Sequence, residues 1–237
     1  MSDTRTAARQ SLRRPRTCYH EAGHCLVRWY FSHWADHAVV LTPEQVRAGD
    51  WPMNRKEIRV THCEGVVIGY DIGPNPYYSS FPSPPSQSEE TRMQVEHSLA
   101  VETDIALVDY SIGIVAEARY TGQSTFVCAL SGGSSDMDYA KRLLDRRFSD
   151  STKRATADVL RYQRARALVR SPQGWNAISA VATALLAKGL VEWDEIDALH
   201  QFAYQADQPS RRDVYNKWPW SLEMLRKGDL APLHRTG

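Results

Sequence analysis

The sequence predicts a mainly helical protein that carries a small β-sheet. Residues 17–33 form an apolar run long enough for a buried helix, and from Ser88 to about residue 204 apolar residues recur at helical spacing. Two short stretches between these helical regions, at 37–42 and 65–72, are rich in β-branched residues and bounded by turn formers. With 237 residues, 42% of them hydrophobic, the chain can bury a core as one large domain or a domain with appendages.

The chain begins with a strongly basic segment. Residues 1–16 contain five arginines and one acidic residue, and Pro15 lies near the end of the segment. We expect a solvated basic arm here, with docking to an acidic partner as the alternative. The helix that follows, over 17–33, is expected to begin at Thr17, whose hydroxyl group is a suitable N-cap.

Two segments interrupt the regular pattern around the predicted strands. Residues 43–62 form an excursion between the strands, and the stretch EIRVTH at its end could add a strand of its own. Residues 73–88 contain five prolines and five serines, so they cannot form regular structure. For this second segment we favour a surface loop over a cover that closes a cleft.

Helices are predicted for most of the second half of the chain. The first of them ends at Gly122, and the next, SSDMDYAKRLLDRRF, has a serine cap followed by acidic residues in its first turn. Further helices are predicted over 152–170, 173–188 and 192–204, and the arginines of the first of these three are expected to face solvent. The tail, 205–237, shows no clear pattern. Its tryptophans could pack on the body of the protein or form a subunit contact.

Composition excludes several classes of function. Lys and Arg number 29 against 28 Asp and Glu, so no net charge draws the chain to nucleic acid or to a membrane surface. The start of the sequence lacks the apolar core of a signal peptide, and no run of residues is apolar enough to span a bilayer. We therefore expect a cytoplasmic protein. The four cysteines form no CxxC pair, which argues against both a disulfide framework and a structural zinc site.

The stretch YHEAGHCLV, residues 19–27, carries the strongest chemical signal. His20 and His24 are four positions apart, so a helix projects both imidazoles from one face, as a shared metal ion requires. Glu21 lies about 100° further round the helix, where it could reach a water molecule on that metal. This is the HExxH pattern of zinc peptidases. The alternative is that both histidines are ordinary helix residues that hydrogen-bond to their neighbours and that Glu21 is solvated.

A catalytic zinc ion usually has three protein ligands and one open position. HExxH supplies two of them, and no HExxHxxGxxH continuation follows, so the third ligand must come from a distant part of the chain. The sequence offers five candidates, namely His62, His97, Glu117, Asp136 and Asp138.

Six segments in order resemble the FtsH-like zinc peptidases, which are the proteolytic domains of membrane AAA proteases. TCYHEAGHCLV resembles the HEAGH helix of that family, and HAVVLTP with GVVIGYDI resembles the strand pair after it. IGIVAEARYTG is similar to the family's GGRxAEExxxG stretch, and SGGSSDMDYAKRLL to its TxGAxxDxxxAxxxA stretch. WNAISAVATALLAKGLVEWDEI resembles the late helical pair. The resemblance spans about residues 17–200 and implies a zincin-type helical peptidase domain.

The resemblance also implies roles for two acidic residues. The aspartate of GAxxD completes the zinc site in that family, and Asp136 occupies the matching position. Asp136 is also expected at a helix start, where the helix dipole favours a carboxylate, so decoration of a helix N-terminus is the alternative role. Glu117 matches the inner glutamate of the AEE stretch. It could orient His20 or His24, or act as a ligand if Asp136 does not.

The chain departs from the family pattern at several positions. In the GGRxAEE stretch, the two glycines correspond here to Ile112 and Gly113. The arginine is replaced by Ile114 and the second glutamate by Ala118. The ATPase domain and the transmembrane helices that precede the peptidase in the family are missing from the sequence. The expected organisation is a basic arm (1–16), a zinc peptidase domain (17–204) with the insertions 43–62 and 73–88, and a C-terminal tail (205–237).

The function that these patterns predict is a zinc-dependent endopeptidase. His20, His24 and Asp136 would hold Zn²⁺, and Glu21 would take a proton from the metal-activated water and pass it to the leaving amine. If the strand at 65–72 lies at a sheet edge, it could bind an extended peptide. The expected substrate is a protein or peptide, with a separate ATPase as the source of unfolding, and the family's hexameric rings suggest a homo-oligomer.

Two other functions remain open from the sequence. The domain could be a catalytically impaired relative that binds a partner or regulates it without cutting, as the altered AEE stretch and the missing ATPase suggest. It could also be a regulatory protease that acts on one transcriptional repressor, which only its substrate profile would separate from a general peptidase.

Overall fold

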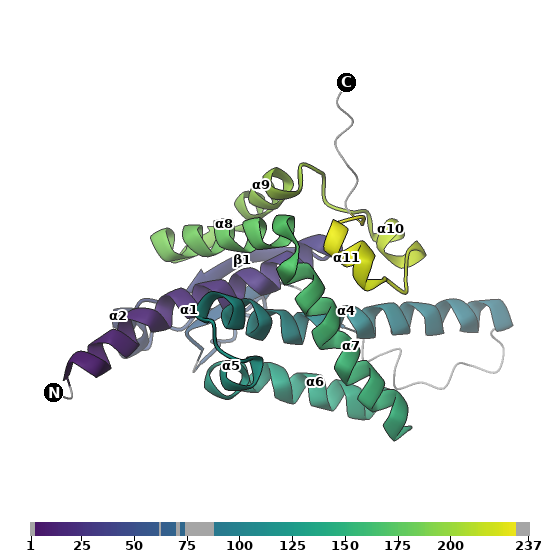
Figure 1. The fold of residues 1–237 in the computed structure, drawn as a ribbon, viewed down its shortest axis with the longest axis horizontal. Helices are drawn as coiled ribbons and strands as arrows, with labels where there is room; N and C mark the ends of the chain where they lie inside the picture. Colours follow the sequence, from purple (N-terminus) through teal and green to yellow (C-terminus); the bar gives the residue numbers. More distant parts are fainter. Residues whose placement is uncertain (1–2, 62, 70–71, 74–87, 231–237) are drawn as a thin grey trace.

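The computed structural model describes residues 3–61, 63–69, 72–73 and 88–230. As predicted, this part of the chain is mainly helical and contains a small sheet of three antiparallel strands (Figure 1). None of the described helices combines the length and the apolar composition that a bilayer-spanning helix needs.

The first helix, α1 (Asp3–Tyr30), begins much earlier than predicted. Residues 3–16 belong to this helix, and they project from one side of the body (Figure 1). Thr17 is therefore not an N-cap, and its hydroxyl group instead donates to the Arg13 carbonyl one turn back. Pro15 removes one intrahelical hydrogen bond. Arg14 and Arg16 nevertheless dock on distant parts of the chain, at the Leu185 carbonyl and Glu117, and these contacts hold the helix against the body.

The sheet has the strand order β2-β1-β3. Strands β1 (Ala35–Val40) and β2 (Gly65–Gly69) are the predicted pair, and Ala38 lies opposite Val67 in their antiparallel register. The third strand, β3 (Leu190–Glu192), was not predicted because three residues between two helices show no period of their own. Strand β2 is an edge strand of this sheet.

The excursion between β1 and β2 is less regular than predicted. It contains one short helix, α2 (Pro43–Ala48), closed by a capping box on Thr42. The expected strand over 57–62 is wrong for residues 57–61, where the structure has only an isolated bridge between Met53 and Arg59. Residue 62 and most of the proline-rich segment, 74–87, lie outside the described residues.

The longest helix, α4 (Glu89–Thr121), agrees with the prediction at both ends. The Ser88 hydroxyl accepts a hydrogen bond from the Thr91 amide at the start, and Gly122 ends the helix in a left-handed conformation. A short helix not expected from the sequence, α5 (Thr125–Ser131), follows. The next, α6 (Ser134–Arg147), has Gly133 as its N-cap with no side-chain cap, so the predicted serine cap is wrong.

The C-terminal third adds three predicted helices and two unexpected ones. The predicted ones are α7 (Ser151–Arg170), α8 (Pro172–Lys188) and α9 (Trp193–Tyr204). The tail forms α10 (Arg211–Asn216) and α11 (Leu222–Lys227).

The tail packs on the body of the protein, which was one of the two alternatives for its tryptophans. Trp220, Leu225 and Leu230 are buried in the main hydrophobic core. The expectation that the arginines of α7 face solvent is wrong for Arg161 and Arg164, which are both buried. Their guanidinium groups are neutralised or hydrogen-bonded by groups on other helices, which removes the cost of burying them.

Helix α1 lies at the centre of the fold and packs most extensively against α4 and α8. Nearly every side chain from Cys18 to Phe31 is buried, including the polar side chains of His20, Glu21, His24 and Arg28. The crossing with α4 is close, since a methyl group on Gly23 would lie 3.0 Å from the Ile112 carbonyl oxygen. This crossing brings the HExxH segment against the middle of α4.

Candidate metal centre

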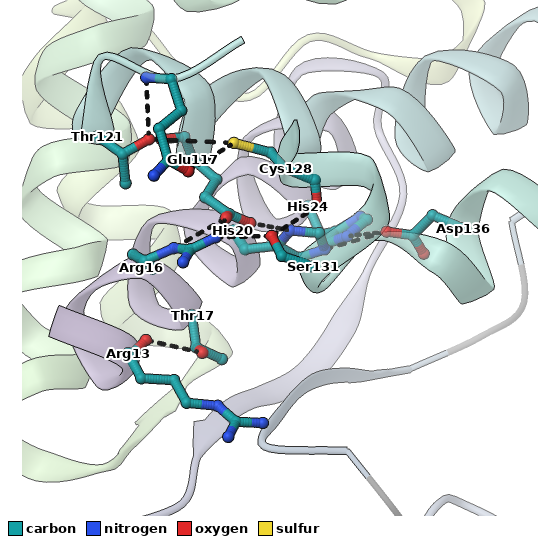
Figure 2. Close-up of polar contacts among 11 residues, drawn as sticks. Arg13, Arg16, Thr17, His20, His24, Glu117, Thr121, Cys128, Ser131 and Asp136 are labelled. Carbon is teal, nitrogen blue, oxygen red and sulfur yellow. Dashed lines mark hydrogen bonds and ion pairs between the residues drawn. The ribbon is translucent and has the colours of Figure 1, made fainter. Parts of the chain in front are cut away.

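The two histidines of the HExxH segment lie on the same face of α1, and both point towards a carboxylate from α6. His20 and His24 are buried, and their ring centroids are 5.0 Å apart. Asp136 Oδ2 lies 3.0 Å from His20 Nε2 and 3.6 Å from His24 Nε2. Figure 2 shows Asp136 reaching towards the two rings from the start of its helix. One ligand atom from each residue lies within 4.8 Å of the others.

Each imidazole also meets a carboxylate through its other nitrogen. His20 Nδ1 lies 3.5 Å from Glu117 Oε2, and His24 Nδ1 lies 3.1 Å from Asp109 Oδ1. Both acids belong to α4 and are buried. Each Nε2 therefore faces Asp136 while each Nδ1 is engaged by a carboxylate behind it.

Asp109 was not among the residues predicted from the sequence. A signal for it exists, because Asp109 is an acidic residue in a long apolar run and precedes Glu117 by eight positions, close to two helical turns. The same helix also carries Glu102 and Asp104, so spacing alone does not say which acid faces α1. Only the crossing of α1 and α4 makes that choice.

Arg16 anchors Glu117 from the other side. Its Nε lies 3.0 Å from Glu117 Oε1, its Nη2 also contacts that oxygen, and Nη2 donates to Ser131 Oγ at 2.7 Å (Figure 2). Ser131 ends α5, so Arg16 joins three helices beside the histidines. Although burial opposes ionisation of Glu117, contacts with His20 and Arg16 hold the pKa of its carboxyl group below the usual value.

Gly113 provides the space in which the His20 ring lies. A methyl group at this position would come within 2.6 to 2.8 Å of three atoms of the His20 imidazole, closer than non-bonded carbon atoms approach. Gly113 therefore allows the ring to lie directly against the α4 backbone, between the turns that carry Asp109 and Glu117.

Glu21 lies against the edge strand of the sheet. A methyl group on Gly65, the first residue of β2, would lie 2.7 Å from Glu21 Cγ and 2.9 Å from its Oε1. The Glu21 side chain is buried, and burial raises the pKa of its carboxyl group above the ordinary value, although the neighbouring His20 and His24 oppose that shift.

The charges of the three converging groups depend on one another. Burial disfavours the imidazolium form of His20, but contacts with Asp136 and Glu117 outweigh it and raise the pKa of His20 to about 9. The pKa of His24 is raised well above its ordinary value for the same reason, with Asp109 and Asp136 as its partners. Hydrogen bonds from both rings hold the pKa of Asp136 below its usual range despite its burial.

The donor set fits a divalent cation of the zinc class. Two imidazole nitrogens and one carboxylate oxygen are common zinc ligands, and three protein ligands leave a position for water. Positive charge between these groups can come from protons on the two imidazoles or from a metal ion that replaces them. The residues present can therefore hold either two protons or one metal ion, and metal uptake is expected to release protons.

The other candidate ligands lie elsewhere. Glu117 contacts Nδ1 of His20, on the side of the ring away from Asp136. Asp138 is exposed on α6, and His97 is exposed on α4, where its Nε2 lies 3.3 Å from the Tyr215 carbonyl oxygen. His62 lies outside the described residues.

No protein-family model matches the chain, and no curated protein matches it at a significant level.

Proposed function

We propose that this protein is a zinc-dependent metallopeptidase of the FtsH-like kind. The observation that carries the proposal is the meeting of His20, His24 and Asp136, from helices more than a hundred residues apart in sequence, with their ligand atoms within 4.8 Å. In this proposal the HExxH segment would supply two ligands and the start of α6 the third, as the resemblance implies.

The chain's own residues would divide the work of peptide hydrolysis. His20, His24 and Asp136 would hold the ion, which when bound supplies an activated water molecule and polarises the scissile carbonyl. Glu21 would accept the proton of the attacking water and deliver it to the leaving amine. Burial raises the pKa of Glu21 above its ordinary value, which is the direction that a carboxyl group needs in order to hold and release a proton.

Strand β2 is the proposed binding site for an extended substrate. It is an edge strand of the sheet, so its outer backbone groups can pair with an added chain. Gly65 at its start lies against Glu21, which would place a paired peptide beside the proposed base. The proposed substrates are unfolded proteins and peptides, and an ATPase that unfolds folded substrates is a proposed partner.

Metal analysis and a protease assay test this proposal directly. We expect the purified chain to contain zinc and to cleave a casein-like unfolded protein, with loss of cleavage on addition of a chelator and recovery on return of zinc. Glu21→Gln is expected to keep the zinc and to lower cleavage at least about 100-fold, since a general base contributes that much or more.

Glu64→Gln is the matched control for this variant. Glu64 lies beside the same strand but pairs with Arg13, so its loss is expected to leave cleavage unchanged. Cleavage retained in Glu21→Gln would refute the assigned base.

A non-cleaving binding module is the second candidate function. One observation favours it: Ile114 and Ala118, at positions where the family has an arginine and a glutamate, pack with Cys128 in a small apolar cluster. Polar groups that serve family members at this place are thus replaced by apolar packing. Zinc binding without cleavage of any unfolded protein would favour this module over the peptidase.

A further inference from the structure

The carboxylate of Asp109 contacts His24 from the side opposite Asp136. Asp109 is 5% exposed and sits in the middle of α4, and its Oδ1 lies 3.1 Å from His24 Nδ1. Neither the HExxH pattern nor the resemblance pointed to this residue.

This contact decides which nitrogen of His24 carries hydrogen when the ring is neutral. A neutral imidazole has one N–H group, and an ionised carboxylate can only accept a hydrogen bond. The hydrogen of His24 is therefore expected on Nδ1, where Asp109 accepts it. That leaves the lone pair on Nε2, which faces Asp136 at 3.6 Å, free to bind a cation.

Asp109 belongs to a row on α4 that matches the two histidines of α1. Asp109, Gly113 and Glu117 recur every four residues, so they lie along one face of the helix. The row runs opposite to α1, because Asp109 meets His24 while Glu117 meets His20. Gly113, between them, leaves room for the His20 ring. Helix α4 thus supplies one carboxylate behind each imidazole.

The two carboxylates differ in how firmly they hold their imidazoles. The Glu117 oxygen is 3.5 Å from His20 Nδ1, beyond the usual hydrogen-bond distance, and the other Glu117 oxygen is occupied by Arg16. The Asp109 oxygen is 3.1 Å from His24 Nδ1, within that distance. His24 is therefore the ring whose orientation depends most directly on its partner acid.

We propose that Asp109 is a positioning residue that orients His24 and fixes its Nε2 as the nitrogen that binds a divalent cation. The inference rests on the proposed metal site, and Asp109 itself does not touch the ion. Ligand orientation by such a carboxylate typically contributes 10- to 100-fold to metal affinity.

The first test measures zinc affinity in Asp109→Asn by competition with a chromophoric chelator at one fixed pH. Asparagine keeps the volume and an accepting oxygen but carries no charge. We expect zinc to bind at least about tenfold more weakly than to the wild type. The visible absorption bands of the Co²⁺-loaded protein are expected to shift as well, because the geometry of the ligand changes.

Asp104→Asn provides the matched control. Asp104 is on the same helix but accepts hydrogen bonds from Arg164 and Trp218, away from the histidines. This control is expected to lower the thermal unfolding temperature while leaving zinc affinity within about twofold, as independent sites do. Equal zinc affinities in Asp109→Asn and the wild type would overturn the inference while leaving the proposed function standing.

The second test needs no substitution. Long-range ¹H–¹⁵N spectra of the zinc-loaded wild type should show hydrogen on Nδ1 of His24 and zinc on Nε2. Zinc bound through Nδ1 of His24 would overturn the inference even if Asp109→Asn failed to fold. A wild type that takes up neither zinc nor cobalt would refute the proposed metal site, and the role of Asp109 with it.

Discussion

The two halves of helix α4 differ in the main partners of their acidic side chains. In the first half, Asp104 accepts hydrogen bonds from Arg164 and Trp218, both at 2.7 Å, and Glu102 accepts from Arg211 at 2.6 Å and from Tyr215. In the second half, Asp109 meets His24, and Glu117 meets His20 as well as Arg16. Glu102 in the first half also lies 3.5 Å from His33 Nε2.

The partners determine what each half can do. A guanidinium group remains charged at every ordinary pH, so Arg164 and Arg211 neutralise their acids permanently and connect the C-terminal helices to the body. An imidazole can lose its proton and bind a metal ion through the freed nitrogen. The first half of α4 therefore suits a structural role and the second half an exchangeable cation, although both occupy one helix.

The largest effect is expected where a permanent charge pair is broken. Arg164→Met keeps the apolar part of the side chain but leaves the partly buried Asp104 without its cation and with only the hydrogen bond from Trp218. Loss of one partner of a buried pair typically costs about 3 kcal/mol or more, so chemical denaturation should show a free energy of unfolding lower by about that amount. Zinc affinity should not change.

Arg170→Met, an exposed position on the same helix, is the control and should stay within about 0.5 kcal/mol of the wild type. A variant at Arg164 as stable as this control would show that the pair contributes little. A loss of zinc affinity in Arg164→Met would contradict the separation between the two halves of α4.

The next largest effect is on the pH dependence of the free energy of unfolding, which separates His200 from the histidines beside α4. His200 on α9 is fully buried, and its Nδ1 lies 2.6 Å from the Ile196 carbonyl oxygen. Burial lowers the pKa of His200 to about 4, so between pH 6.5 and 4 the unfolded chain binds a proton that the folded chain does not. The free energy of unfolding should fall across that window by on the order of 3 kcal/mol. In His200→Leu this fall should be much smaller.

The histidines of the proposed metal site are expected to change stability with pH in the opposite direction in metal-free protein. Because the pKa of His20 is raised to about 9, its contribution to stability is fully present below pH 6.5 and is lost as pH rises through 9. Denaturation curves measured from pH 4 to 9, with and without a chelator, separate the two windows.

A His200→Leu variant with the acid sensitivity of the wild type would contradict the assignment to His200.

The smallest effect comes from a single methyl group in the α1–α4 crossing. Gly113→Ala places that methyl group against the His20 ring, which must move to relieve contacts of 2.6 to 2.8 Å. We expect zinc to bind about tenfold more weakly, since a displaced ligand loses orientation, with the helical circular dichroism spectrum retained. Gly122→Ala is not a suitable control because Gly122 has a positive φ of 69°.

Val115→Ala serves as the control, because it changes one buried side chain two residues from Gly113 without adding a methyl group. It should reduce stability and leave zinc affinity close to that of the wild type. Unchanged zinc affinity in Gly113→Ala would mean that the His20 ring has more freedom than its contacts indicate.

The sequence by itself determined the features that depend on local spacing. The four-residue interval between His20 and His24 places both rings on one helix face whatever surrounds them, and the Ser88 and Gly122 caps set the ends of α4. The helical class followed from the same periodicity. Asp136 was reached through a resemblance, because no local rule connects it to the HExxH segment.

Tertiary structure alone decided which distant groups meet. Asp109 and Asp104 are both aspartates of the same helix. The crossing with α1 gives Asp109 a histidine partner, and the packing of α7 gives Asp104 an arginine partner. Strand β3 and the packing of Trp220 likewise depend on long-range contacts. Such contacts bring together residues far apart in the chain, and their free energy does not appear in any short stretch of it.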